Sequence, residues 1–83
     1  MPRMPRDISG RKLTKLLEQY GYQLEREKGS HIRFISTYKG TEHKITIPDH
    51  DNLKIGTLSN ILKDISAYLS IDKEALVKSL FNK

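Results

Sequence analysis

The sequence predicts an α+β domain in which a three-stranded antiparallel sheet carries helices on one face. Three observations lead to this fold class. Leucines at helical spacing occur near the N-terminus, and three short segments that alternate apolar and polar residues follow them. Two more apolar stripes at helical spacing complete the chain. The predicted order is therefore α-β-β-β-α plus a C-terminal helix, and a single sheet with helices packed on one side accommodates that order.

A first helix is predicted over about Gly10–Tyr20. Ser9 precedes it and is a common N-cap residue, because its hydroxyl accepts a hydrogen bond from a free backbone N–H group. Gly21 follows the helix and provides a stop signal. The apolar side chains between these two signals have the spacing of one helix face: Leu13, Leu16, Leu17 and Tyr20.

Three strands are predicted over Tyr22–Lys28, Ile32–Tyr38 and Lys44–Ile47, and Arg26 continues the phase of Tyr22. Pro48 ends the third strand because proline has no N–H group for a ladder hydrogen bond. Side chains alternate between the two faces of a strand, so the apolar phase is expected to face the helices: Tyr22, Leu24, Ile32, Phe34, Ile45 and Ile47. The other phase is expected to form an open face: Gln23, Glu25, Glu27, His31, Arg33, Ile35, Lys44 and Thr46.

Two helices are predicted after the sheet. Thr57 is the expected cap of the first, and Ser70 or Asp72 begins the second. The first helix carries an apolar stripe that is expected to belong to the core: Leu58, Ile61, Leu62, Ile65 and Leu69. If the sheet leaves the terminal helix uncovered, three of its side chains would form a surface for a partner: Leu76, Leu80 and Phe81.

The composition indicates one domain over residues 1–83, with residues 1–8 as a flexible basic arm and residues 70–83 as an additional C-terminal helix. The net charge is +5, which favours phosphate-rich partners. The absence of cysteine excludes disulfides, Fe–S clusters and thiolate zinc sites. Three dispersed histidines do not form a metal-site pattern, so neither a metal nor another cofactor is expected. Met1–Asp7 lacks the apolar region of a signal peptide, and no apolar run is long enough to span a membrane, so a cytoplasmic protein is expected.

The tripeptide Gly29-Ser30-His31 is the main candidate for a functional site. Gly29 can adopt the positive φ of a tight turn, and His31 then begins a strand on the open face. Imidazole can accept and release a proton near neutral pH, so His31 is the candidate catalytic residue. The alternative is an exposed histidine beside a hairpin. Ser30 can contact a phosphate or bond locally within the turn.

Several cations are close to this tripeptide in the predicted sheet. Arg33 and Lys44 either bind phosphate or belong to a solvated face in which they pair with Glu25 or Glu42. Lys28, next to the turn, is a further phosphate-binding candidate. Two other histidines are set apart: the phase of its strand places His43 on the inward side, and His50 follows the third strand in a loop.

Four ordered segments resemble the HicA (YcfA-like) toxins, which are mRNA interferases of toxin–antitoxin modules. The matching residues are Ser9-Gly10-Arg11-Lys12-Leu13 with Leu16-Leu17 and Gly21-Tyr22; Lys28-Gly29-Ser30-His31 with Phe34; Ile45-Thr46-Ile47-Pro48 with His50; and Gly56-Thr57-Leu58 with Ile61-Leu62. The resemblance implies an α-β-β-β-α fold like that of double-stranded-RNA-binding domains, with the family's essential histidine at His31. It also implies metal-independent cleavage of mRNA and inhibition by a HicB-like antitoxin. The alternative function is a non-catalytic RNA-binding domain of the same fold.

Overall fold

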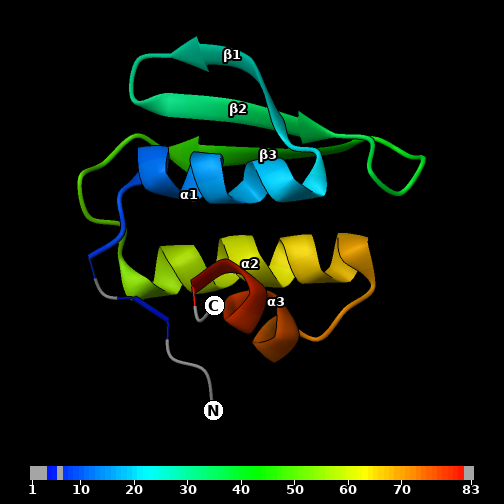
Figure 1. The fold of residues 1–83 in the computed structure, drawn as a ribbon. Helices are drawn as coiled ribbons and strands as arrows, with labels where there is room; N and C mark the ends of the chain where they lie inside the picture. The colour runs from blue at the N-terminus through cyan, green and yellow to red at the C-terminus, as the bar shows by residue number, and fades with distance from the viewer. Residues whose placement is uncertain (1–3, 6, 82–83) are drawn as a thin grey trace.

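The structure is a computed structural model that describes residues 4, 5 and 7–81. Its elements follow the predicted order (Figure 1), and they are α1 (Gly10–Leu17), the 3₁₀ turn η1 (Glu18–Tyr20), β1 (Gln23–Lys28), β2 (His31–Ser36), β3 (His43–Pro48), α2 (Ile55–Leu69) and α3 (Lys73–Phe81). The predicted α+β fold is therefore confirmed. Within the described residues, every helix falls short of the length and apolar character needed to cross a membrane.

The two predicted ends of the first helix are in place. The Ser9 hydroxyl accepts a hydrogen bond from the backbone N–H of Lys12 at 3.0 Å, which satisfies one of the free donors of the first turn. Gly21 has a φ of 78°, a left-handed conformation that stops the helix. The last turn tightens into η1, so the α-helix proper is shorter than predicted.

The sheet has the strand order β1-β2-β3, and both strand pairs are antiparallel. On the covered face, Ile32 lies opposite Ile47 and Phe34 opposite Ile45, and all four side chains are buried. The helices pack mainly against β3, and Figure 1 shows β1 on the far side of the sheet from α1. The other face of the sheet is left open, as the alternation of residues predicts.

The predicted phase of β1 is wrong beyond Leu24, because the pairing with β2 shifts between Leu24 and Arg26. An inserted residue in one strand reverses the face of every side chain that follows it. Arg26 therefore lies opposite Arg33 on the open face, and Glu27 lies opposite the buried Ile32. Leu24 itself is 55% exposed, since β1 is an edge strand and the helices do not cover it there.

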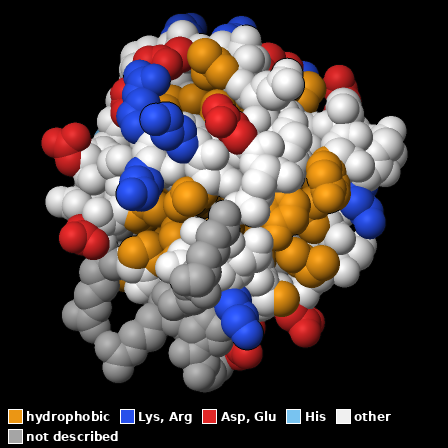
Figure 2. Space-filling view, in the orientation of Figure 1, with side chains coloured by type: hydrophobic (Ala, Val, Ile, Leu, Met, Phe, Trp, Pro, Cys, Tyr) orange, Lys and Arg blue, Asp and Glu red, His pale blue; other side chains and the backbone are white. Residues whose placement is uncertain are grey.

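The C-terminal helix α3 packs on the core instead of remaining open. Leu76 and Leu80 are buried against the other helices, and the Tyr20 hydroxyl lies 2.7 Å from the Ser79 hydroxyl. Phe81 is only half-buried and lines a groove with Leu16. Figure 2 shows hydrophobic side chains that reach the surface over α2 and α3.

Two predicted boundaries differ from the structure. Thr57 does not cap α2, because the helix already begins at Ile55 and Lys54 is its N-cap residue. In the predicted N-terminal arm, Ile8 is 5% exposed, and its carbonyl accepts a hydrogen bond from the Leu53 N–H at 2.8 Å. Ile8 therefore belongs to the core. The rest of the arm prediction falls largely on residues 1–3 and 6, which lie outside the described residues.

The start of α1 is held against the end of β3. The Gly10 N–H donates to the His50 carbonyl at 3.0 Å. A Cβ atom at Gly10 would lie 2.0 Å from the carbonyl oxygen of Pro48, so only glycine allows this approach. The end of β3 is therefore fixed, and Pro48 lies opposite His31 in the sheet.

Candidate active site on the open sheet face

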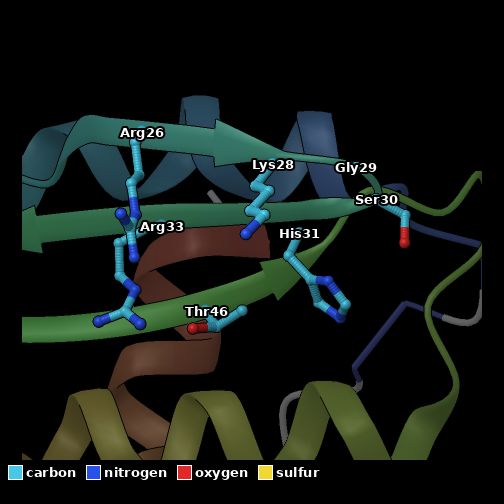
Figure 3. Close-up of a pocket in the computed structure, with 7 residues that line it drawn as sticks. All are labelled: Arg26, Lys28, Gly29, Ser30, His31, Arg33 and Thr46. Carbon is cyan, nitrogen blue, oxygen red and sulfur yellow. The ribbon is translucent and has the colours of Figure 1, made fainter.

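The open face of the sheet contains a solvent-accessible hollow of about 630 Å³ at the end where β1 turns into β2. Figure 3 shows the residues that line it: Arg26, Lys28, Gly29, Ser30, His31, Arg33 and Thr46. The hollow thus brings together His31 and three cations, and the sequence alone placed two of these, Lys28 and Arg33, near the histidine. Among the residues that the structure describes, no acidic side chain lines it.

His31 is the first residue of β2, and it lies between Lys28 on β1 and Pro48 on β3. Because it sits in the central strand, its backbone is held from both sides, while its side chain is exposed. Gly29 has a φ of 57°, and a Cβ atom there would meet no atom within 4 Å. Glycine is therefore needed at this turn for its backbone conformation and not for space.

The turn itself is anchored from outside the hairpin. The Asp49 N–H donates to the Ser30 carbonyl at 2.7 Å. The Asp49 carboxylate accepts hydrogen bonds from Arg11 Nε at 3.2 Å and Nη2 at 3.0 Å. Arg11 Nη2 also contacts Glu27 Oε2 at 2.5 Å. Hydrogen bonds to Asp49 and then to Glu27 raise the pKa of Arg11, so this guanidinium stays charged and ties α1 to β1 and to the chain beyond β3.

These anchoring contacts are missing from the sequence-based prediction. The sequence alone singles out Arg11 only within the segment that resembles the HicA toxins, and it gives Asp49 no role. The position of Asp49 directly after Pro48 is the one available signal, because it places a carboxylate at the end of β3 next to the turn. Its two partners, Ser30 and Arg11, come from distant parts of the sequence, and sequence spacing does not bring them together.

Arg26 is the functional candidate that the sequence-based phase missed. The β-bulge turns its side chain to the open face, directly opposite Arg33. Figure 3 shows the two side chains next to each other, with Lys28 and His31 farther along the same strands. Among residues 4, 5 and 7–81, Arg26, Lys28 and Arg33 have no carboxylate within ion-pair distance. Their charge is therefore available to an anion.

A comparison with protein families identifies the family to which the chain belongs. The family model described as "HicA toxin of bacterial toxin-antitoxin" matches residues 10–66, which is more than half of the chain. The chain belongs to the HicA toxin family. It is therefore the toxin component of a toxin–antitoxin system. No curated protein and no solved structure matched the chain.

Two predicted phosphate-binding residues of this HicA-family toxin, Lys44 and Ser30, are not grouped with the cations in the hollow. Lys44 does not line the hollow, and its Nζ lies 3.3 Å from Glu25 Oε2, one of the ion pairs that the sequence left open. Ser30 lines the hollow but lies beyond His31 at the turn, with its hydroxyl away from the two arginines (Figure 3). Its carbonyl is used to anchor the turn.

The other two histidines of the HicA-family toxin are outside the hollow. His43 is packed between β3 and the helices, where its ring stacks on Tyr68 at a centroid distance of 4.6 Å. Its Nδ1 lies 2.6 Å from the Tyr22 hydroxyl and its Nε2 lies 3.3 Å from Asp64 Oδ1. His50 is exposed in the loop after β3. In the described part of the chain, no three His, Asp or Glu side chains are grouped to hold a metal ion.

Proposed function

We propose that this HicA-family toxin is an endoribonuclease that cleaves mRNA, with His31 as the proton-transfer group. One observation carries the proposal: an exposed imidazole on a fixed backbone shares a hollow with three cations, and none of the described acidic residues lines it. Such a hollow attracts a polyanion and places a general acid/base group next to it. Membership of a toxin family supports a damaging activity on a cellular polymer.

The chemistry follows from the groups available. As a general base, His31 takes the proton of a ribose 2′-hydroxyl, and the 2′-oxygen attacks the neighbouring phosphorus. The bond from phosphorus to the 5′-oxygen breaks, and that oxygen takes up a proton from water as it leaves. The products are a 2′,3′-cyclic phosphate and a 5′-hydroxyl end. The 2′-hydroxyl supplies the nucleophile, so the proposed reaction proceeds without a metal ion or another cofactor.

Lys28 stabilises the negative charge that builds up on the oxygens of the reacting phosphate, and Arg33 adds a second phosphate-binding cation on the same face. Both are close to His31 in the sheet, Lys28 directly opposite it on β1 and Arg33 two residues along β2. Hydrogen bonds from charged donors to phosphate are stronger than neutral ones. Lys44 can add only to the general field of the face, because its ammonium is paired with Glu25. Ser30 contributes a hydroxyl at the edge of the hollow.

The partners proposed for the chain follow from the same assignment. The substrate is mRNA in the cytoplasm, and the inhibitor is a HicB-like antitoxin that would cover the hollow or its rim. A non-catalytic RNA-binding domain is the second candidate, because the same exposed cations attract RNA without cleaving it. The first function predicts that the protein cleaves RNA repeatedly, and the second predicts binding without cleavage.

The test compares wild-type protein with His31→Ala on a single-stranded RNA in the presence of a chelator. The proposal predicts cleavage by the wild type, products with cyclic-phosphate ends, and a rate lower by about 10²–10⁴ for His31→Ala. His50→Ala is the matched control, since it removes an exposed imidazole outside the hollow. Binding without cleavage by the wild type would favour the second candidate.

A second substrate decides whether His31 acts as base or acid. In a substrate with sulfur in place of the leaving 5′-oxygen, the leaving atom needs no proton. If His31 is the general acid, this substrate restores cleavage by His31→Ala. If His31 is the general base, the variant remains slow on both substrates.

A further inference from the structure

The two arginines of the hollow form an unfavourable pair in the free protein. Arg26 and Arg33 lie directly opposite each other in the register of β1 and β2, on the open face. Like charges at directly opposed positions destabilise a sheet. On the same face Lys44 is paired with Glu25, whereas the described residues provide no carboxylate for either arginine. An anion from outside the chain would therefore relieve the repulsion between the two arginines.

The β-bulge is what creates this pair. Without the inserted residue, strict alternation from Leu24 would turn Arg26 and Lys28 toward the helices. The shift between Leu24 and Arg26 brings both cations to the open face with His31. Bulges often redirect side chains next to active sites. The irregularity in β1 thus delivers two of the three cations that line the hollow.

The spacing of the cations fits a nucleic acid strand. Lys28 and His31 form one row across β1 and β2, and Arg26 and Arg33 form the next row on the same face. Rows that are two residues apart on a strand are separated by about 6.8 Å. That separation is similar to the distance between successive phosphates of an extended single strand. A guanidinium group also binds two phosphate oxygens at once, which favours arginine at such a position.

We propose that Arg26 and Arg33 bind the phosphate adjacent to the cleaved one, so that a single RNA strand runs along β2. Lys28 and His31 then contact the phosphate at which the bond breaks. The position of the arginine subsite relative to the cleaved bond depends on the function proposed above. The existence of a phosphate subsite at the arginine pair does not depend on cleavage. Its occupant is the RNA backbone and not a base, so this row confers affinity and direction without sequence preference.

The first test measures binding without cleavage. The full chain carrying His31→Ala is titrated with a single-stranded oligonucleotide at several salt concentrations, with and without Arg26→Gln and Arg33→Gln together. We expect weaker binding and a salt-dependence slope that is smaller by about 0.7, the value for one phosphate contact on a single strand. Lys63→Gln is the control, because Lys63 is an exposed cation on α2 outside the hollow, and the slope should hardly change. Arg26→Lys should keep the slope.

The stability of the free protein distinguishes loss of the phosphate contact from misfolding. Arg26→Gln removes the repulsion from Arg33, so the midpoint of urea unfolding should rise or stay constant while RNA binding weakens. If the double variant binds RNA with the affinity and slope of its parent, the proposal is wrong, and an acidic protein surface becomes the occupant of the pair. A lower unfolding midpoint for Arg26→Gln would also contradict the repulsion argument.

The second test locates the subsite. A substrate with one cleavage position receives a single uncharged methylphosphonate linkage, either next to the cleaved bond or several nucleotides away. The neutral linkage next to the cleaved bond should weaken binding by the His31→Ala protein and should have little further effect on the variant that also lacks both arginines. Equal sensitivity of the two proteins would overturn the assignment. If the arginines affect binding while the wild type never cleaves RNA, the proposed function fails and the phosphate subsite remains.

Discussion

Two histidines of this small domain, His31 and His43, occupy opposite surroundings on the same sheet. His43 is packed against Tyr68, with Tyr22 at one ring nitrogen and Asp64 at the other. The tautomer with hydrogen on Nε2 satisfies both contacts, because Nε2 donates to Asp64 and Nδ1 accepts from the tyrosine hydroxyl. His31 is exposed and lies among cations. One ring is fixed by the fold, and the other is open to a ligand.

The difference shows why the number of contacts is a poor guide to function. His43 lies between a carboxylate, Asp64, and a hydroxyl, Tyr22, an arrangement that resembles a catalytic triad. The Tyr22 side chain is fully buried, however, and burial raises the pKa of its hydroxyl. That cluster therefore joins the residue before β1 to β3 and α2, while the proposed proton-transfer role falls to His31, which has fewer contacts.

His43→Ala tests whether His43 has a structural role, and the largest loss of stability is expected for this variant. The substitution leaves the Tyr22 hydroxyl without its partner and removes the ring that stacks on Tyr68. We expect a loss of about 2 kcal/mol in the free energy of unfolding, measured by urea denaturation. RNA cleavage per folded molecule should stay at the wild-type level. A large loss of cleavage with unchanged stability would reverse the two assignments.

Gly29→Val tests whether the turn before β2 positions His31. The residue must adopt a φ of 57°, which is unfavourable for a side chain by about 1–2 kcal/mol even though there is space around it. We expect slower RNA cleavage because His31 is displaced. Gly29→Asn is the matched control, since asparagine tolerates this conformation. Wild-type rates for Gly29→Val would show that the turn does not position His31.

Tyr22→Phe tests the buried end of the His43 cluster, and its effect should be the smallest, about 1 kcal/mol at neutral pH. Burial raises the pKa of Tyr22 in the folded protein. The folded state therefore favours the neutral hydroxyl, and this contribution is fully present below about pH 10, the ordinary pKa of tyrosine. It is lost as the pH rises from there through the folded pKa.

Urea unfolding at pH 9 and pH 11 measures this alkaline loss. The wild type should lose more free energy of unfolding between the two pH values than Tyr22→Phe. Equal losses in the two proteins would indicate that Tyr22 ionises as easily in the folded state as in the unfolded one.

Much of the fold could be predicted from the sequence because its signals are local. The Ser9 cap, the Gly21 stop and the apolar phases of β2 and β3 depend on neighbouring residues and on a regular period. The exposure of His31 follows from the same alternation. These features need no information about which distant residues meet.

The parts that the sequence did not predict depend on irregularity or on distant contacts. The bulge in β1 has no glycine or proline to mark it, so the period of two placed Arg26 and Glu27 on the wrong faces. The contacts of Arg11 with Asp49 and Glu27 link α1, β1 and the loop after β3, which are far apart in the sequence. The arginine pair became visible only when the register of the strands was known.

The most direct test of the central claim compares His31→Ala and His43→Ala in one experiment, with RNA cleavage and the free energy of unfolding measured on the same preparations. We expect His31→Ala to lower the cleavage rate by about 10²–10⁴ and to change the free energy of unfolding by no more than about 0.5 kcal/mol. For His43→Ala we expect cleavage at the wild-type rate and a loss of about 2 kcal/mol in the free energy of unfolding. Cleavage by His31→Ala at the wild-type rate would contradict the claim that the exposed histidine transfers the proton.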